Sequence, residues 1–188
     1  MRRNVDLLYI VMDNQIYGLT TGGLTTGQTS PTSRVGMKTK SMPFGNIEAP
    51  VNPISLALAA GATFVARGFS AEQKHLTELI KQGIRHKGLS FLDVFSPCVT
   101  YNQDNTYQWF RPRVKKLEGD RAYHPADWTA AMGKSLLWGE EIPIGKFFER
   151  TDVPSLHGAE PVLNAGPLAY AEMRIPVDVA QAFVEELM

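Results

Sequence analysis

The sequence has very little cysteine: Cys98 is the single one among 188 residues. One cysteine excludes an intramolecular disulfide and favours a reducing, cytoplasmic setting. Long hydrophobic runs are also missing. The longest apolar window, residues 53–66, is too short to span a bilayer and is interrupted by Gly61 and Thr63. We expect no signal peptide, because the charged residues 1–4 run directly into a strand-like segment without a cleavage-site pattern. These absences argue against a membrane partner.

An excess of either charge is absent too. Lys and Arg together number 19, as do Asp and Glu, so the formal net charge is zero. A net charge of zero gives no electrostatic indication that the chain binds nucleic acid or an anionic membrane. The hydrophobic content of 44% and the charged content of 20% are ordinary for a globular protein. We therefore predict one main globular domain with a substantial core.

Hydrophobic periodicity in the first half of the chain predicts buried strands at residues 5–13, 63–67 and 89–95. Helices are predicted between them, at residues 54–60 and 70–87. Ser70 and Gln73 match a capping box at the start of the second helix, and Gly88 supplies its stop. Strands that alternate with helices favour a parallel sheet with right-handed crossovers, so the predicted class is α/β.

The second half of the chain has a weaker pattern. One helix is predicted at residues 126–138, with Trp128 and Leu136 among its inward-facing residues. Residues 139–175 are rich in Pro and Gly, which predicts a loop or an extended arm. Residues 177–187 are predicted to form a short amphipathic helix with an apolar face.

A polar segment follows the first predicted strand. Residues 14–53 are rich in Gly, Thr, Ser and Pro, and a loop of this length is usually functional or disordered. Asn14, at the carboxyl end of the strand, offers a neutral oxygen ligand to a hard cation such as Mg²⁺. The Gly and Thr residues after it offer N–H groups and hydroxyls to phosphate oxygens. Ligands of open α/β sheets bind at this end of the strands. From the residues alone, the alternative that Asp13 and Asn14 only begin a turn stays open.

The run Asp-Asn-Gln-Ile-Tyr-Gly-Leu-Thr at residues 13–20, with Gly-Gln-Thr-Ser-Pro-Thr-Ser at 27–33, resembles a known motif. It is similar to the second half of the thiamine diphosphate motif of 2-oxoacid:ferredoxin oxidoreductase β subunits. The resemblance implies a thiamine diphosphate-binding α/β fold, a parallel sheet between helical layers. The first half of the motif, a Gly-Asp-Gly strand end, is missing, so we expect a fold that is incomplete at the N-terminus. Residues 1–150 would be the C-terminal part of that domain, and residues 151–188 a C-terminal extension or arm.

The resemblance also implies the residues of a cofactor site. In the family, Mg²⁺ is held by an upstream Asp, by the Asn that matches Asn14, and by the backbone carbonyl that matches Ile16. The upstream Asp is missing from this sequence. The residues that would lie against the diphosphate are Gly18, Leu19 and Thr20. The segment Gly-Leu-Thr-Thr-Gly at 18–22 is repeated identically at 23–27, which inserts five residues into the cofactor loop. Whether the loop then still binds the cofactor is open.

Cys98 follows the third predicted strand, in the segment Ser-Pro-Cys-Val-Thr. From the residue alone, a single cysteine is most often a small buried hydrophobe. The segment also resembles the corresponding one of the same family, which implies that Cys98 is the last ligand of a 4Fe-4S cluster. Such clusters normally require four thiolates. Cys98 therefore cannot hold a cluster alone.

The resemblance implies an enzyme, and this chain as its β subunit or a fragment of it. The reaction would be thiamine diphosphate-dependent oxidative decarboxylation of a 2-oxo acid to acyl-CoA, with electrons passing to ferredoxin. The implied partners are the α subunit, ferredoxin, the 2-oxo acid and coenzyme A. The Glu that activates the cofactor would come from the α subunit, so no catalytic residue is assigned in this chain. Two alternatives stay open: a non-catalytic remnant that only packs with a partner subunit, and a non-oxidative thiamine diphosphate decarboxylase or carboligase.

Overall fold

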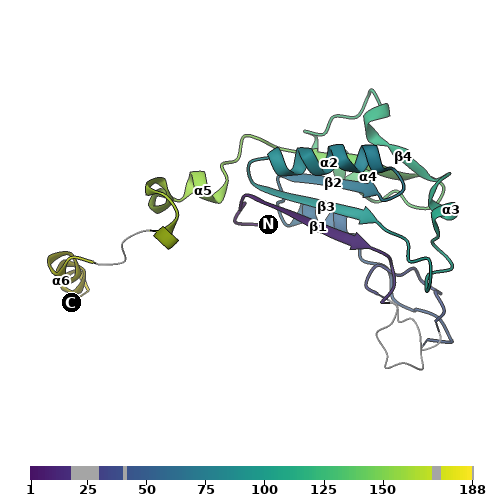
Figure 1. Ribbon diagram of the computed structural model, residues 1–188, viewed down its shortest axis with the longest axis horizontal. Coiled ribbons are helices and arrows are strands. Elements are labelled where there is room, and N and C mark those ends of the chain that lie inside the picture. Colours follow the sequence, from purple (N-terminus) through teal and green to yellow (C-terminus); the bar gives the residue numbers. More distant parts are fainter. Residues whose placement is uncertain (18–29, 40–41, 171–174, 188) are drawn as a thin grey trace. The chain divides into compact units, whose positions relative to one another are not determined.

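The computed structural model describes residues 1–17, 30–39, 42–170 and 175–187. The chain separates into two compact units, Met1–Leu156 and His157–Met188, which are described separately below. The first unit holds the sheet (Figure 1). Among the described residues, no helix combines the length and the apolar character that crossing a membrane requires.

The first unit is built on one five-stranded sheet. In chain order its strands are β1 (Leu7–Asp13), β2 (Phe64–Phe69), β3 (Leu89–Phe95), β4 (Val114–Lys116) and β5 (Ile142–Glu149). In space their order is β1-β3-β2-β5-β4. β3 pairs in parallel with both β1 and β2, as the strand–helix–strand pattern predicts. β5 runs antiparallel to β2, while β4 runs parallel to β5. The α/β class is confirmed, and the sheet is mixed rather than wholly parallel.

Helices cover both faces of this sheet. In chain order they are α1 (Pro53–Ala59), α2 (Gln73–Arg85), α3 (Tyr107–Phe110) and α4 (Trp128–Ser135), with a 3₁₀ turn at Leu117–Gly119. On one face, Phe64 and Ala66 of β2 share a hydrophobic cluster with Leu79 of α2. On the other face, Val65 of β2 shares a cluster with Ile54 of α1. Successive side chains of a strand point to opposite faces, so β2 anchors both helical layers.

The second unit is made of short helical segments. After α5 (Leu156–Ala159) come 3₁₀ turns at Pro161–Ala165 and Leu168–Tyr170, and then α6 (Val177–Glu186). No residue of α6 is buried, and apolar side chains such as Phe183 and Val184 are exposed. The helix predicted at residues 177–187 is therefore confirmed, and its apolar side chains are exposed.

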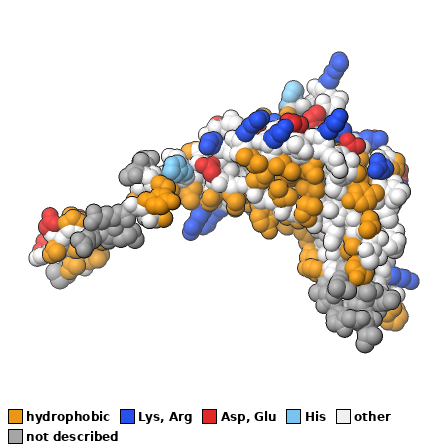
Figure 2. Space-filling view, viewed as in Figure 1, with side chains coloured by type: hydrophobic (Ala, Val, Ile, Leu, Met, Phe, Trp, Pro, Cys, Tyr) orange, Lys and Arg blue, Asp and Glu red, His pale blue; other side chains and the backbone are white. Residues whose placement is uncertain are grey.

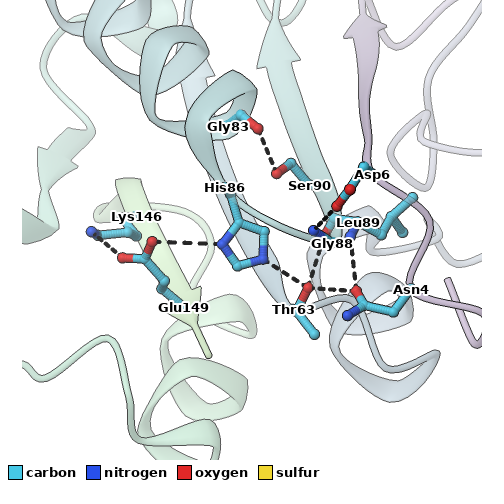
Figure 3. Close-up of polar contacts among 10 residues, drawn as sticks. All are labelled: Asn4, Asp6, Thr63, Gly83, His86, Gly88, Leu89, Ser90, Lys146 and Glu149. Atoms are coloured by element: carbon cyan, nitrogen blue, oxygen red, sulfur yellow. Dashed lines mark hydrogen bonds and ion pairs between the residues drawn. The ribbon is translucent and has the colours of Figure 1, made fainter. Parts of the chain in front are cut away.

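A buried polar network lies at the amino ends of the strands (Figure 3). The Thr63 hydroxyl donates to Asn4 Oδ1 at 2.7 Å and lies 2.8 Å from His86 Nε2. Asn4 Oδ1 also accepts a hydrogen bond from the Leu89 N–H at 2.8 Å. The network joins the segment before β1, the residue before β2, and the turn between α2 and β3. It therefore fixes the three parallel strands relative to one another at the end away from the site described below.

Three expectations about the elements are wrong. Ser70 does not cap α2, which begins without a side-chain capping hydrogen bond. Trp128 and Leu136 are exposed rather than inward-facing. The segment 139–175 is not only loop, because it contains β5, whose antiparallel pairing with β2 places most of its residues in the core.

Candidate functional site

The carboxyl end of β1 continues into a tight turn that carries the predicted metal ligands. Asn14 Oδ1 accepts a hydrogen bond from the Ile16 backbone N–H at 3.0 Å. Ile16 is buried and Asn14 is half-buried. This is the local turn that the sequence left open as an alternative. An amide oxygen has two lone pairs, so Asn14 can accept this bond and still offer an oxygen to a cation. The turn and the metal-ligand interpretation are compatible.

The turn is held in place by side chains from a following loop. The Thr32 hydroxyl donates to Asp13 Oδ1 at 2.6 Å, and the same oxygen accepts from the Gln15 N–H at 3.0 Å. The Ser33 hydroxyl donates to the Gln15 carbonyl. These bonds support a left-handed φ of 60° at Gln15, a conformation that costs about 1–3 kcal/mol in a non-glycine residue. Burial raises the pKa of Asp13 above its usual value, while the hydrogen bonds from Thr32 and Gln15 oppose that shift.

Asn46 fastens the rest of this loop. Its Nδ2 donates to the Ser33 carbonyl at 3.2 Å and to the Glu48 carbonyl at 3.1 Å. Its backbone carbonyl accepts from the Gly36 N–H at 2.7 Å. A single buried residue thus ties three points of the loop together, which keeps Thr32 and Ser33 beside the turn after β1.

Asn102 joins the two segments that carry predicted ligands. Its backbone N–H donates to the Cys98 carbonyl at 3.1 Å, and its Nδ2 donates to the Asn14 carbonyl at 3.0 Å. Its Oδ1 accepts from the N–H groups of Asp104 and Asn105 at 3.1 and 3.0 Å. The loop after β3 is therefore attached to the turn after β1. Sequence reasoning assigned no role to Asn102, because an asparagine in a loop does not reveal its partners.

The structure brings Asn14, Ile16 and Cys98 to the same end of the sheet. The Ser96 N–H donates to the Asp13 carbonyl at 2.9 Å, so β1 and β3 end level with each other. Cys98 is a half-buried free thiol. In the part of the chain that the structure describes, no three His, Cys, Asp or Glu side chains group as a metal site. The predicted diphosphate contacts lie outside the described residues: Gly18, Leu19 and Thr20.

A buried ion pair stands beside this turn, and sequence reasoning missed it. Arg67 Nε of β2 donates to Asp93 Oδ2 of β3 at 2.8 Å, and the two side chains are 3% and 0% exposed. Two atoms of the pair, Arg67 Nη1 and Asp93 Oδ1, have no partner among the described residues. The guanidinium lies 4.9 Å from the Phe95 ring and 5.4 Å from the Phe147 ring. Burial raises the pKa of Asp93 to about 6, although Arg67 opposes the shift.

A cavity of about 310 Å³ opens next to these charges. Its lining combines polar and apolar side chains, among them Asp13, Arg34, Val51, Arg67, Phe95 and Trp138. The carboxyl ends of β1, β2 and β3 therefore frame a concave space of the size and mixed chemistry that small-ligand sites have.

Comparison with known proteins connects this geometry to a family. Residues 1–94, half of the chain, match the family profile described as "Thiamine pyrophosphate enzyme, C-terminal TPP binding domain". Residues 98–165 match the profile for the C-terminal part of the pyruvate ferredoxin oxidoreductase beta subunit. The chain is 47% identical over 163 residues to a 2-oxoacid:ferredoxin oxidoreductase subunit beta of Sulfolobus sp, and 46% identical over 157 residues to one of Saccharolobus solfataricus. The chain belongs to the 2-oxoacid:ferredoxin oxidoreductase β-subunit family.

The resemblance noted in the sequence is thereby confirmed. The alignments with these two relatives cover 82% and 79% of this chain but 52% and 50% of the relatives themselves. The chain therefore spans about half the length of these relatives. A solved structure, "2-oxoglutarate:ferredoxin oxidoreductase from Magnetococcus marinus with 2-oxoglutarate, coenzyme A and succinyl-CoA bound", matches with a TM-score of 0.80 at 32% identity. That match covers 98% of this chain and 59% of the other. The thiamine diphosphate-binding α/β fold is confirmed as well.

Proposed function

We propose that this chain acts as a β subunit, or as part of one, in a cytoplasmic 2-oxoacid:ferredoxin oxidoreductase. The enzyme would decarboxylate a 2-oxo acid, transfer the acyl group to coenzyme A and pass the electrons to ferredoxin. An α subunit would be required as partner. The names of the relatives and the ligands bound in the matching solved structure support this assignment.

The observation that carries the proposal is the placement of Asn14 and Ile16 at the carboxyl end of β1. The Asn14 side-chain oxygen and the Ile16 carbonyl are neutral oxygen donors, which suit Mg²⁺ when phosphate oxygens and water complete its shell. We assign these two residues to the metal. The residues assigned to the diphosphate, for which Gly and Thr supply N–H groups and hydroxyls, are Gly18, Leu19 and Thr20.

Bound thiamine diphosphate supplies the carbanion chemistry that releases CO₂ from a 2-oxo acid. The chain itself contributes position. Thr32 and Ser33 hold the turn after β1 in a conformation that it would not keep alone. Asn102 attaches that turn to the loop after β3. The protein thus supplies a site whose oxygen donors are fixed before the cofactor arrives, which lowers the entropy lost on binding.

We assign Cys98 as one thiolate ligand of a 4Fe-4S cluster. Clusters of this type take four thiolates, and the sequence contains one cysteine, so the other ligands would come from polypeptide outside this sequence. Asn102 donates hydrogen bonds to the backbone carbonyls of Cys98 and Asn14, so it would hold the residue assigned to the cluster and the residue assigned to the metal in fixed relative positions.

A non-catalytic subunit that only packs with a partner is the second candidate function. It is favoured by the repeat of Gly-Leu-Thr-Thr-Gly at residues 18–22 and 23–27, which inserts five residues into the sequence of the cofactor loop. Iron and cofactor content separate the two candidates. An assembly with the α subunit that retains both iron and thiamine diphosphate after gel filtration supports the oxidoreductase, and one that retains neither supports the non-catalytic role.

Asn14→Ala tests the metal assignment. In the chain assembled with the α subunit, we expect the Mg²⁺-dependent affinity for thiamine diphosphate to fall about 10- to 100-fold, because an oxygen ligand is lost. Isothermal titration calorimetry measures this affinity directly. Gln103→Ala removes an exposed amide from the neighbouring loop and should leave the affinity unchanged. An unchanged affinity in Asn14→Ala would overturn the assignment.

A further inference from the structure

The cavity of about 310 Å³ at the carboxyl ends of β1, β2 and β3 takes no part in the function proposed above. Asp13 and Gln15 line it, whereas Asn14, Ile16 and Cys98 do not. The residues assigned to the metal and to the cluster therefore stand outside it. Figure 1 shows β1 and β3 ending side by side at this end of the sheet. The cavity is thus a separate concave space next to the turn after β1, with no ligand assigned to it.

The cavity opens on the face of the sheet that carries α1. Arg67 of β2 and Asp93 of β3 are partners in the register of the two strands. Val65 and Phe91 stand two residues before them and pack in the cluster that contains Ile54 of α1. Side chains two residues apart on a strand share a face, so Arg67 and Asp93 lie on this face as well. The ion pair is therefore placed where the hydrophobic cluster ends and the cavity begins.

The charged groups of the lining do not match one another. Asp13 and Asp93 supply two carboxylates and Arg67 one guanidinium, while Arg34 pairs with Asp104 at 2.8 Å. The contact between Arg67 and Asp93 leaves Nη1 and Oδ1 without partners among the described residues, although buried polar atoms normally have one. Burial, and then the Asp13 carboxylate, raise the pKa of Asp93 to about 6. The lining is therefore short of one acceptor beside the guanidinium and of one cationic donor beside the carboxylates.

The rest of the lining is apolar and partly open to solvent. Val51, Leu136 and Trp138 line the cavity and are 42%, 66% and 47% exposed. Phe95 adds a buried ring beneath the Arg67 guanidinium. Apolar side chains around a concave space with a few polar groups are typical of ligand sites, and about 310 Å³ is at the small end of their range. A fitting ligand is therefore small, with a charged end and an apolar end.

We propose that this cavity binds an apolar α-amino acid of the size of leucine or phenylalanine. Its carboxylate would accept hydrogen bonds from Arg67, its ammonium group would donate to Asp93, and its side chain would pack against Leu136. A carboxylate ligand without an ammonium group would leave the acidic side chains unpaired, and an amine would leave the guanidinium unpaired. A zwitterion supplies both partners at once. The site is independent of the proposed function, since it needs neither thiamine diphosphate nor Mg²⁺.

Isothermal titration calorimetry of the full chain, without cofactor or metal, tests the ligand class. We expect L-leucine and L-phenylalanine to bind. Two analogues of leucine each lack one charge: isocaproate lacks the ammonium group and isoamylamine lacks the carboxylate. Each should bind at least about tenfold more weakly than leucine, because one charged group of the cavity stays unpaired. Absence of binding by both amino acids, or an analogue that binds as tightly as leucine, would overturn the proposal.

Two neighbouring leucines test the location. Leu136 lines this cavity, while Leu137 is also exposed but lies outside it. Leu136→Asp should weaken leucine binding at least about fivefold, because an apolar contact is lost, whereas Leu137→Asp should leave it unchanged. Circular dichroism checks that both variants fold. Equal effects of the two changes would mean that leucine binds elsewhere, and the proposal would fail.

Removal of the ion pair tests the two charge contacts. In Arg67→Met combined with Asp93→Leu, leucine should lose its advantage over isocaproate and isoamylamine, because neither charged partner is left. A retained advantage would contradict the assignment of Arg67 and Asp93. Cofactor affinity tests the proposed function separately, so either proposal can fail without the other.

Discussion

At the scale of single residues, Arg67 and Asp93 place an ion pair where charges are expensive. The pair shares one hydrogen bond, between Nε and Oδ2, and leaves Nη1 and Oδ1 without partners among the described residues. Removing two charges from water costs several kcal/mol per ion, and a single-point contact recovers only part of that cost. The aromatic rings beside the guanidinium contribute further attraction. The pair therefore fixes the ends of β2 and β3 relative to each other, but it adds little net free energy to folding.

Arg67→Met should lower the free energy of unfolding by about 3–5 kcal/mol, because it leaves the Asp93 carboxylate buried without a partner. Urea unfolding near neutral pH, followed by circular dichroism, measures the loss. Arg67→Met combined with Asp93→Leu removes both charges and should recover most of it. A single variant as stable as the parent chain would show that the pair has no such role.

His86 is a second buried titratable residue, at the opposite end of the strands. Burial lowers the pKa of His86 below its usual value of 6.5, and the carboxylate of Glu149 opposes the shift only in part. Just below pH 6.5 the unfolded chain therefore binds a proton that the folded chain does not. The contribution of His86 to stability is present above pH 6.5 and is lost as the pH falls through the lowered pKa.

His86→Gln should flatten this pH dependence. We expect the parent chain to lose more free energy of unfolding than the variant between about pH 7 and about pH 5.5, because glutamine has no imidazole to protonate. Denaturant titrations at both pH values measure the difference. His124→Gln removes an exposed histidine and should keep the parent profile. Parallel profiles for the parent chain and His86→Gln would contradict the assignment.

Residues differ in how far the sequence identifies them. The placement of Asn14 and Cys98 at one end of the sheet is predictable from the sequence, because each residue follows an apolar run that predicts a strand. Arg67 and Asp93 carried a weaker signal: two opposite charges inside apolar strands must meet if both strands are buried. Asn102 carried none, because its partners depend on how two separate loops fold.

At the scale of elements, the strands of the first half are predictable and β5 is not. The observed β3 coincides with the predicted residues 89–95, since the apolar run is bounded by Gly88 and Pro97. β5 contains Pro143 and Gly145, residue types that usually interrupt strands. In the structure Gly145 has a φ of 117°, and the register between β5 and β2 shifts between Lys146 and Phe148. A parallel sheet was therefore predicted, whereas two strands, β5 and β4, run opposite to the other three.

Gly88→Ala tests the turn that joins α2 to β3. Gly88 has a φ of 119°, and a Cβ there would meet Asn4 Oδ1 and lie 2.7 Å from Thr63 Oγ1. We expect a loss of at least about 2 kcal/mol in the free energy of unfolding, from backbone strain and from displacement of the network in Figure 3. Gly61→Ala is the matched control: its φ is 81° with open space around the Cβ, so only about 1 kcal/mol should be lost. Equal losses would show that the network adjusts freely.

At the scale of the whole molecule, the two units differ in how they are stabilised. The first has three hydrophobic clusters on and around its sheet, while α6 of the second buries none of its residues. The α/β class is predictable from sequence, because it follows from alternating elements. The strand order is not, since nothing local fixes the place of β5.

Truncation after Leu156 should leave the first unit folded. We expect its melting temperature to change by less than about 2 °C, because each 1 kcal/mol lost would lower it by a few degrees and the second unit buries little. Differential scanning calorimetry of the full and truncated chains measures this. A fall of several degrees would mean that the second unit supports the sheet.

The two edges of the sheet are chemically unlike. The far edge is β4, a strand of three residues whose Lys115 and Lys116 are exposed, and short charged edges resist strand addition. The near edge is β1, and Figure 2 shows hydrophobic side chains gathered over the region where Figure 1 places it, with Leu7, Tyr9, Ile10 and Met12 exposed. A sheet with one apolar edge and one short charged edge can pair with a further strand at the apolar edge only. Association through β1 alone would therefore end at a pair of chains and could not extend into a fibre.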